Sequence, residues 1–234
     1  MIGLSARHLV SERMDDPALD PQQHRAALRG LARINRCSRT VPVIWSRLEP
    51  WLRDSDHVVR VLDLATGGGD LAIGLAERAQ RCGRPLQMIA GDISPTACAH
   101  TAERAAAAGV TIDTAVFDAL RDAWPDDIDI VVNSLFLHHL NEDDVVHILQ
   151  RAAACARLGG VVSDLRRTRR GYVLAAAGVR LLSRSPIVHD DGPQSVRAAF
   201  TTEELRALVE RAGIPHATVR STFPQRHLIT WRRR

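Results

Sequence analysis

Strand-like and helix-like patterns alternate along the middle of the chain, and this alternation most restricts the fold. Stretches with helical apolar spacing, such as LAIGLAERAQR and EDDVVHILQRAAACAR, separate short apolar runs. The candidate strands are residues 58–64, 86–90, 110–115, 128–134 and 160–164. Such alternation predicts a parallel sheet with helices on both faces. Because the crossovers are right-handed, the carboxyl ends of the strands share one edge, where open α/β sheets bind ligands.

The flanking segments predict a lid and a cap around this unit. Residues 1–56 are expected to be an N-terminal helical lid, with a helix starting at Asp20-Pro21-Gln22-Gln23. Residues 57–234 are expected to form the main domain, ending in a helix capped near Thr201 and two strands. Within it, residues 165–199 are interpreted as an insertion that caps the ligand site, with an apolar helix and a loop at HDDGPQSVR.

Composition excludes some classes of protein. All 31 basic residues among 234 are arginines, and the formal net charge is +4. Two arginine clusters, residues 166–170 and 232–234, lack the interleaved aromatics of nucleic-acid surfaces, so no nucleic-acid partner is expected. The four cysteines are far apart without metal-site spacing, which favours reduced thiols in the cytoplasm. No signal peptide or transmembrane segment is expected.

The loop after the first predicted strand is rich in glycine. In VRVLDLATGGGD, residues 59–70, three consecutive glycines follow the strand. Glycine lets a ligand approach the backbone closely, and the N–H groups of the following helix start point into the same space. Residues 67–72 also fit the G-x-G-x-x-[GA] fingerprint of dinucleotide sites. The loop alone therefore predicts a nucleotide-like ligand.

Acidic residues at the strand ends favour a cationic ligand over a dinucleotide. Asp63 and Asp70 would repel a pyrophosphate, whereas they would attract a positively charged ligand. Asp92 ends the second strand, where a carboxylate accepts hydrogen bonds from ribose hydroxyls. Asp118 follows the third strand, where a carboxylate can accept from an adenine amino group. Ordinary capping or turn chemistry would suit one aspartate better than three. The cofactor predicted is S-adenosylmethionine.

Four motifs, in their order and spacing, resemble motifs I to IV of class I methyltransferases. They are VLDLATGGGDLA, GDISPTACAHTAERA, FDAL and IDIVVNSLFLHHL. The loop is most similar to that of ubiquinone/menaquinone C-methyltransferases and related small-molecule enzymes, which also have alanine at the position of Ala65. The broader family has glycine there. The resemblance implies a Rossmann-like α/β fold with a seven-stranded, mostly parallel sheet of order 3-2-1-4-5-7-6, its last strand antiparallel.

The resemblance also implies the cofactor-binding residues. Asp92, with Ile93 beside it, would hold the ribose, and Asp118 with Ala119 would meet the adenine. The backbone near Asn133 would face the amino-acid portion. The loop residues implied around the methionine moiety are Asp63, Ala65, Thr66, Gly67, Gly69 and Asp70.

A histidine pair follows the fourth predicted strand. His138 and His139 would lie over the transferable methyl group, and imidazole is a suitable general base for a phenol, enol or carboxylic acceptor. Asp164 could orient this base. Because related enzymes carry LHH here, His138 is the first choice, although one histidine of the pair could instead pack or cap the next helix. His189, beside Asp190, is a second candidate base or part of a solvated turn.

Position alone suggests the remaining site residues. Phe136, Tyr172 and Arg197 are candidates for the acceptor pocket. No metal is expected, because Asp164, His189 and Asp190 lack ligand spacing. The apolar helix from Tyr172 indicates a lipophilic or aromatic acceptor, a core helix or the face of a homodimer.

The leading hypothesis is small-molecule O-methylation of a phenolic, quinol or polyketide-like hydroxyl in secondary metabolism. C-methylation of a quinol-like ring is the nearest competing hypothesis. A nucleic-acid methyltransferase is disfavoured, because NSLF lacks the prolines of a [DN]-P-P-[YF] signature. Two further hypotheses are an NAD(P)-dependent oxidoreductase and a binding module without turnover.

Overall fold

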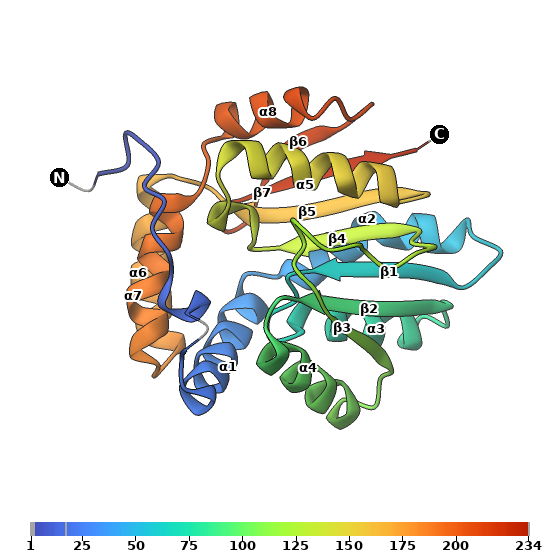
Figure 1. Cartoon of the computed structure of the whole chain (residues 1–234), viewed down its shortest axis with the longest axis horizontal. Coiled ribbons are helices and arrows are strands. Elements are labelled where there is room, and N and C mark those ends of the chain that lie inside the picture. Colours follow the sequence, from blue (N-terminus) through green and yellow to red (C-terminus); the bar gives the residue numbers. More distant parts are fainter. Residues whose placement is uncertain (1–2, 17, 234) are drawn as a thin grey trace.

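The computed structural model describes residues 3–16 and 18–233 (Figure 1). Within them, the strands form one sheet of order β3-β2-β1-β4-β5-β7-β6. Neighbouring strands pair in parallel except β7, which is antiparallel to β5 and β6. The predicted Rossmann-like order is therefore confirmed. The strands are β1 (Val59–Leu64), β2 (Leu86–Asp92), β3 (Ile112–Val116), β4 (Ile130–Ser134), β5 (Gly159–Leu165), β6 (Thr218–Thr222) and β7 (Arg226–Arg232).

The helices begin at the residues that local sequence signals favour. Asp20 accepts hydrogen bonds from two backbone N–H groups of the first turn of α1, and Thr201 forms a capping box with Glu204 in α8. The helices are α1 (Pro21–Cys37), α2 (Thr40–Arg53), α3 (Asp70–Arg81), α4 (Pro95–Ala107), α5 (Glu142–Cys155), α6 (Arg169–Leu182), α7 (Pro186–Ala198) and α8 (Thr202–Arg211), with short 3-10 turns η1 (Arg13–Asp15) and η2 (Leu137–His139).

Two apolar cores lie on opposite faces of the sheet. Alternate side chains of β1 point to opposite faces, so Val61 packs in a cluster with α2 and α3. Leu62 packs in the other cluster, with α5 and α8. The sheet is thus covered on both faces, and its carboxyl-end edge is the place left for a ligand.

Helices α1, α6 and α7 group together at one end of the sheet, away from the α5 and α8 layer (Figure 1). The N-terminal segment runs along α7, where the His8 N–H donates to the Arg197 carbonyl at 3.0 Å and the Met14 N–H donates to Asp191 at 3.2 Å. The prediction of helix throughout residues 1–56 is wrong for this segment. Apart from η1, the described part before α1 is irregular and is held by contacts with α7.

The segment predicted as a loop at HDDGPQSVR belongs to a helix. Residues 186–198 form α7, with Pro193 inside it. Val188 and Val196 are buried on this helix, so packing outweighs the helix-breaking residues. Gly192 is required for the close approach of α6, because a Cβ atom there would lie 2.4 Å from the Val179 side chain.

Candidate active site

A cavity of about 1150 Å³ lies at the carboxyl ends of β1, β2 and β4. One wall comes from α1, and another comes from the turn that follows β4. Most of the predicted cofactor residues line it, and Gly69 and Asn133 are the two that do not. Those lining it are Asp63, Ala65, Thr66, Gly67, Asp70, Asp92, Ile93, Asp118 and Ala119.

The glycine loop turns through left-handed backbone at three positions. The φ angles are 51° at Ala65, 55° at Gly67 and 74° at Gly69. A Cβ atom on Gly69 would lie 2.6 Å from the buried Thr101 side chain, so this position requires glycine for both conformation and space. The loop therefore bends tightly back from β1 into α3 and exposes its backbone to the cavity.

Two carboxylates flank this loop, that of Asp63, which is buried, and that of Asp92, which is half-buried. Asp63 accepts a hydrogen bond from the Thr66 hydroxyl at 2.8 Å, and burial raises the pKa of Asp63 to about 7. Asp92 accepts from the N–H groups of Gly67 at 2.8 Å and Ser94 at 2.9 Å, and burial also raises the pKa of its carboxyl group. A cation in the cavity would stabilise the ionised form of either group.

Asp70 lines the cavity, and its negative charge is compensated by a neighbouring arginine. Its carboxylate forms an ion pair with Arg104 at 2.5 Å and accepts a hydrogen bond from Asn35 at 3.1 Å. Arg104 also donates to the Gly68 carbonyl. Because the charge of Asp70 is compensated, the argument for a cationic ligand depends on Asp63 and Asp92.

The remaining predicted cofactor residues have clear partners. Asp118 accepts from the Leu120 N–H at 2.8 Å, which orients the carboxylate at the end of β3. The Asn133 side chain donates to the Leu64 carbonyl at 2.6 Å and so joins β4 to β1. Its carbonyl oxygen is buried and has no partner among the described residues.

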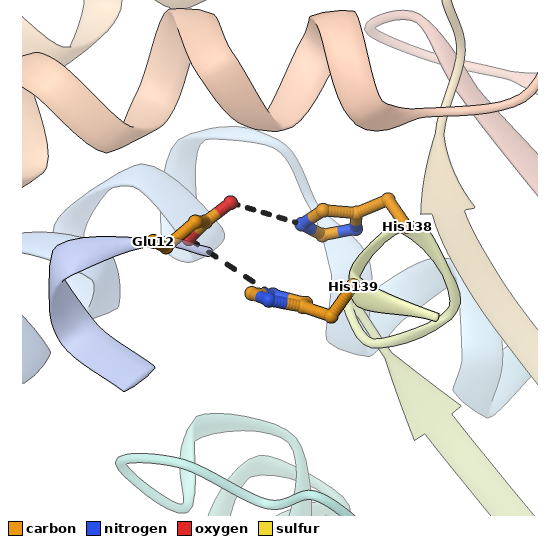
Figure 2. Close-up of side chains that lie close together, drawn as sticks. All are labelled: Glu12, His138 and His139. Atoms are coloured by element: carbon orange, nitrogen blue, oxygen red, sulfur yellow. Dashed lines mark ion pairs between the residues drawn. The ribbon is translucent and has the colours of Figure 1, made fainter. Parts of the chain in front are cut away.

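The histidine pair forms one cluster with acidic residues from distant parts of the chain. His138 Nδ1 lies 2.7 Å from Asp164, and His138 Nε2 lies 3.6 Å from Glu12. His139 Nδ1 lies 3.0 Å from Asp15, and its Nε2 lies 3.9 Å from Glu12. Figure 2 shows both rings directed toward the Glu12 carboxylate. His139, Glu12 and Asp15 line the cavity, whereas His138 is buried behind it.

The electrostatics distinguish the two histidines. Burial alone would lower the pKa of His138, but Asp164 and Glu12 outweigh it and raise this pKa to about 10. Burial would likewise raise the pKa of Asp164, but the charge and hydrogen bond of His138 hold it at about 2. His138 and Asp164 therefore form a buried ion pair in this state, and an imidazolium cannot accept a proton.

Sequence reasoning missed Glu12 and Asp15. Neither residue lies in a recognisable motif, and they are far from the histidines along the chain. It also missed Arg226 on β7, a buried guanidinium that donates to Ser38 at 2.9 Å and Thr40 at 2.6 Å. Burial lowers its pKa to about 10. Thr40 lines the cavity, so a positive charge lies directly behind this wall.

Three further predicted site residues, His189, Tyr172 and Arg197, do not line the cavity, like Gly69, Asn133, His138 and Asp164. His189 Nε2 contacts the Ser183 carbonyl at 2.8 Å, and its neighbour Asp190 pairs with Arg13, so the expected His189–Asp190 pair does not form. The Tyr172 ring lies beneath the Arg197 guanidinium at 5.8 Å. Tyr172 and Arg197 are absent from the cavity walls, whereas Phe136 lines them.

Comparison with known families now identifies the central unit. Residues 61–160 match the family model described as a methyltransferase domain. This range contains the glycine loop, Asp92, Asp118 and the histidine turn.

Residues 61–160 form a class I S-adenosylmethionine-dependent methyltransferase domain. The match includes the loop and the strand-end acids but establishes no subgroup.

Solved structures share the fold of this domain at low sequence identity. A SAM-dependent methyltransferase from Aquifex aeolicus is 16% identical with a TM-score of 0.61, covering 91% of this chain and 97% of its own. An O-methyltransferase family 2 protein from Planctomyces limnophilus in complex with apigenin is 18% identical with a TM-score of 0.61, covering 91% and 62%. Human N-acetylserotonin methyltransferase is 19% identical with a TM-score of 0.59, covering 92% and 56%.

Some of the matching solved structures are considerably longer than this chain. The chain spans 56% and 55% of the length of two further matching structures. Comparison with curated protein sequences yields no match. Among the described helices, none has the length and hydropathy needed to cross a membrane.

Proposed function

We propose that the protein transfers the methyl group of S-adenosylmethionine to a hydroxyl oxygen of a small aromatic, quinol or polyketide-like acceptor. The observation that carries this proposal is the shared cavity, which joins the glycine loop and Asp92 to the carboxylate–imidazole cluster at Glu12, Asp15 and His139. The end with the glycine loop and Asp92 has the groups that would bind the methyl donor, S-adenosylmethionine. The end with Glu12, Asp15 and His139 has groups that can accept a proton from the acceptor hydroxyl.

The cavity has features that fit the donor. Asp92 presents a half-buried carboxylate for ribose hydroxyls, and Asp63 presents a buried one for the cationic amino-acid end. The positive charge of Arg226 behind Thr40 favours a carboxylate nearby, and S-adenosylmethionine carries one. The volume of about 1150 Å³ exceeds the usual size of a site for one small ligand, so an acceptor can bind beside the donor.

The chemistry needs alignment and removal of one proton. When bound, S-adenosylmethionine supplies an electrophilic methyl group: the acceptor oxygen forms a bond to it, and the electron pair of the broken C–S bond stays on sulfur. Aligning the two reactants supplies much of the rate acceleration. We assign His139 to receive the hydroxyl proton, because it lines the cavity and Asp15 holds its Nδ1. His138 and Asp164 position the turn that carries it.

Residues 1–56 and 165–199 are proposed to act as lid and cap. Leu28 and Leu31 of α1 line the cavity, and α6 and α7 pack against α1. Within the described chain, no residue of 165–199 lines the cavity, so α6 and α7 would act by holding α1 against it. This arrangement supports exclusion of water and selection of the acceptor by the wall that α1 forms. The apolar leucines favour an acceptor with an apolar ring, as in the leading hypothesis.

C-methylation of a quinol-like ring remains the second candidate. It would use the same donor site and the same base, since deprotonating a ring hydroxyl also activates the adjacent carbon. Products from a panel of phenols and quinols, analysed by mass spectrometry and NMR, would distinguish an ether methyl from a ring methyl.

Calorimetry with S-adenosylhomocysteine tests the donor site directly. Binding to the wild type is expected at one molecule per chain, with NADH as the control that should not bind. Saturable NADH binding with no binding of S-adenosylhomocysteine would refute the proposal in favour of an oxidoreductase.

A further inference from the structure

The three side chains in Figure 2 converge as ligands of one ion would. One ligand atom from each of Glu12, His138 and His139 lies within 4.8 Å of the others. The separations of 3.6 Å and 3.9 Å between the imidazole Nε2 atoms and the carboxylate oxygens are too long for hydrogen bonds. Zinc–ligand bonds of about 2.0–2.2 Å separate two tetrahedral ligand atoms by roughly 3.4 Å. The side chains therefore stand close to coordination spacing.

In both imidazoles, the nitrogen that faces away from Glu12, Nδ1, contacts a carboxylate. Asp164 lies 2.7 Å from Nδ1 of His138, and Asp15 lies 3.0 Å from Nδ1 of His139. A metal ion would take the place of the Nε2 proton of His138, so that the ring keeps its proton on Nδ1 and directs its Nε2 lone pair toward Glu12. Metal-binding histidines are commonly oriented by this carboxylate–imidazole arrangement. It is present twice, on adjacent residues.

The cluster also has an excess of negative charge. Glu12, Asp15 and Asp164 surround only two imidazoles, and the side chains of Glu12 and Asp164 are 10% and 4% exposed. Nearby Arg7 donates to the backbone carbonyls of His138 and Leu140 instead of these carboxylates. A divalent cation between the rings and Glu12 would compensate this charge next to the largely buried Glu12 carboxylate.

We propose that Glu12, His138 and His139 bind one divalent transition-metal ion, with Zn²⁺ as the representative ion. Two imidazoles and one carboxylate favour zinc or a neighbouring first-row metal over magnesium or calcium, which prefer oxygen ligands. Three protein ligands leave a fourth position open, as catalytic zinc sites do. Glu12 and His139 line the cavity, so that position can be reached from it.

The role of the ion rests on the proposed function, whereas its binding does not. An acceptor hydroxyl bound at the open position would have a lowered pKa and would release its proton to water in the cavity. The oxygen would then attack the methyl group as described above. In the metal-bound state His139 is a ligand and not the base.

Metal binding is tested on the full chain after treatment with EDTA and dialysis. Titration of the wild type with Zn²⁺ in a calorimeter is expected to show one tight ion per chain. Glu12→Gln should lose this ion or bind it at least about 100-fold more weakly, and Asp15→Asn should bind it about 10–100-fold more weakly. The control is His147→Gln, because His147 is exposed on α5 and lies outside the cluster.

The outcomes separate this inference from the proposed function. Equal Zn²⁺ stoichiometry and affinity in the wild type and Glu12→Gln, or no tight ion in either, would overturn the metal site. S-adenosylhomocysteine binding is measured on the same preparations. If S-adenosylhomocysteine binds but no tight ion does, the proposed function is supported and the metal site is rejected. A tight, Glu12-dependent ion without S-adenosylhomocysteine binding supports the metal and rejects the proposed function.

Discussion

The carboxylate of Asp164, in β5, lies 2.7 Å from Nδ1 of His138 in η2. The same carboxylate accepts hydrogen bonds from the backbone N–H groups of Phe136 at 3.1 Å and Leu137 at 2.6 Å. One buried side chain thus fixes the whole turn that carries the histidine pair and the cavity-lining Phe136. The geometry of the acceptor end depends on this contact between β5 and η2.

Asp164→Asn is expected to destabilise the protein by about 3–5 kcal/mol, because it removes one partner of a buried ion pair and leaves the other uncompensated. Urea unfolding measures the loss. The matched control is Asp190→Asn, since Asp190 pairs with Arg13 on the surface and exposed pairs contribute about 0–1 kcal/mol. Equal effects of the two substitutions would show that the Asp164 contact does not hold the turn.

Asp92→Ala is expected to weaken S-adenosylhomocysteine binding about 10–100-fold, which corresponds to hydrogen bonds to a charged group worth about 1.5–3 kcal/mol. Calorimetry gives the affinity, and circular dichroism checks that the fold is retained. Asp113→Asn serves as the control, because Asp113 is exposed on β3 and contacts Gln87. Unchanged affinity in Asp92→Ala would argue strongly against the assignment of the ribose site.

Asp63 should make the free energy of unfolding depend on pH between about 4 and 7. Burial raises its pKa from 3.8 to about 7, so in this range the unfolded chain has lost a proton that the folded protein keeps. The unfolded state therefore gains stability as the pH rises, and the contribution of Asp63 to folding falls until about pH 7 and is constant above. Asp63→Asn removes this contribution.

The measurement compares urea unfolding of the wild type and Asp63→Asn at pH 5 and pH 7.5. The variant should be relatively more stable at the higher pH. A difference between the two proteins that does not change with pH would show that Asp63 ionises normally in the folded protein.

Gly69→Ala is expected to lower the free energy of unfolding for two reasons, the backbone conformation at this position and a collision of the new Cβ atom. Left-handed backbone at φ 74° costs a non-glycine residue about 1–2 kcal/mol, and the collision with Thr101 adds about 1–3 kcal/mol. Gly83→Ala is the matched control, because φ is 61° there but a Cβ atom would meet nothing within 4 Å. Thermal unfolding should place Gly69→Ala well below Gly83→Ala. If the two variants melt together, the contact with Thr101 carries no cost.

The cofactor end of the cavity was predictable from sequence because its residues are tied to local structure. Asp63 lies near the end of β1, Asp92 ends β2 and Asp118 follows β3, and parallel strands bring their carboxyl ends to one edge. The apolar periodicity that identifies the strands therefore also indicates where these acids meet. The compensation of Asp70 by Arg104 was not predictable, because it depends on how α4 packs beside the loop.

The sequence by itself determined the alternation of strands and helices, the caps at Asp20 and Thr201 and the acids around the glycine loop, since each depends on short-range periodicity or on neighbouring residues. The order of the strands in the sheet followed from the resemblance of the four motifs to class I methyltransferases. Only the tertiary structure decided that α7 is a helix and that Glu12 and Asp15 lie against His138 and His139. The segment before α1 has no periodicity of its own, so its path depends on packing against α7. Contacts between such distant segments are fixed by shape and charge in the folded chain, and no local pattern encodes them.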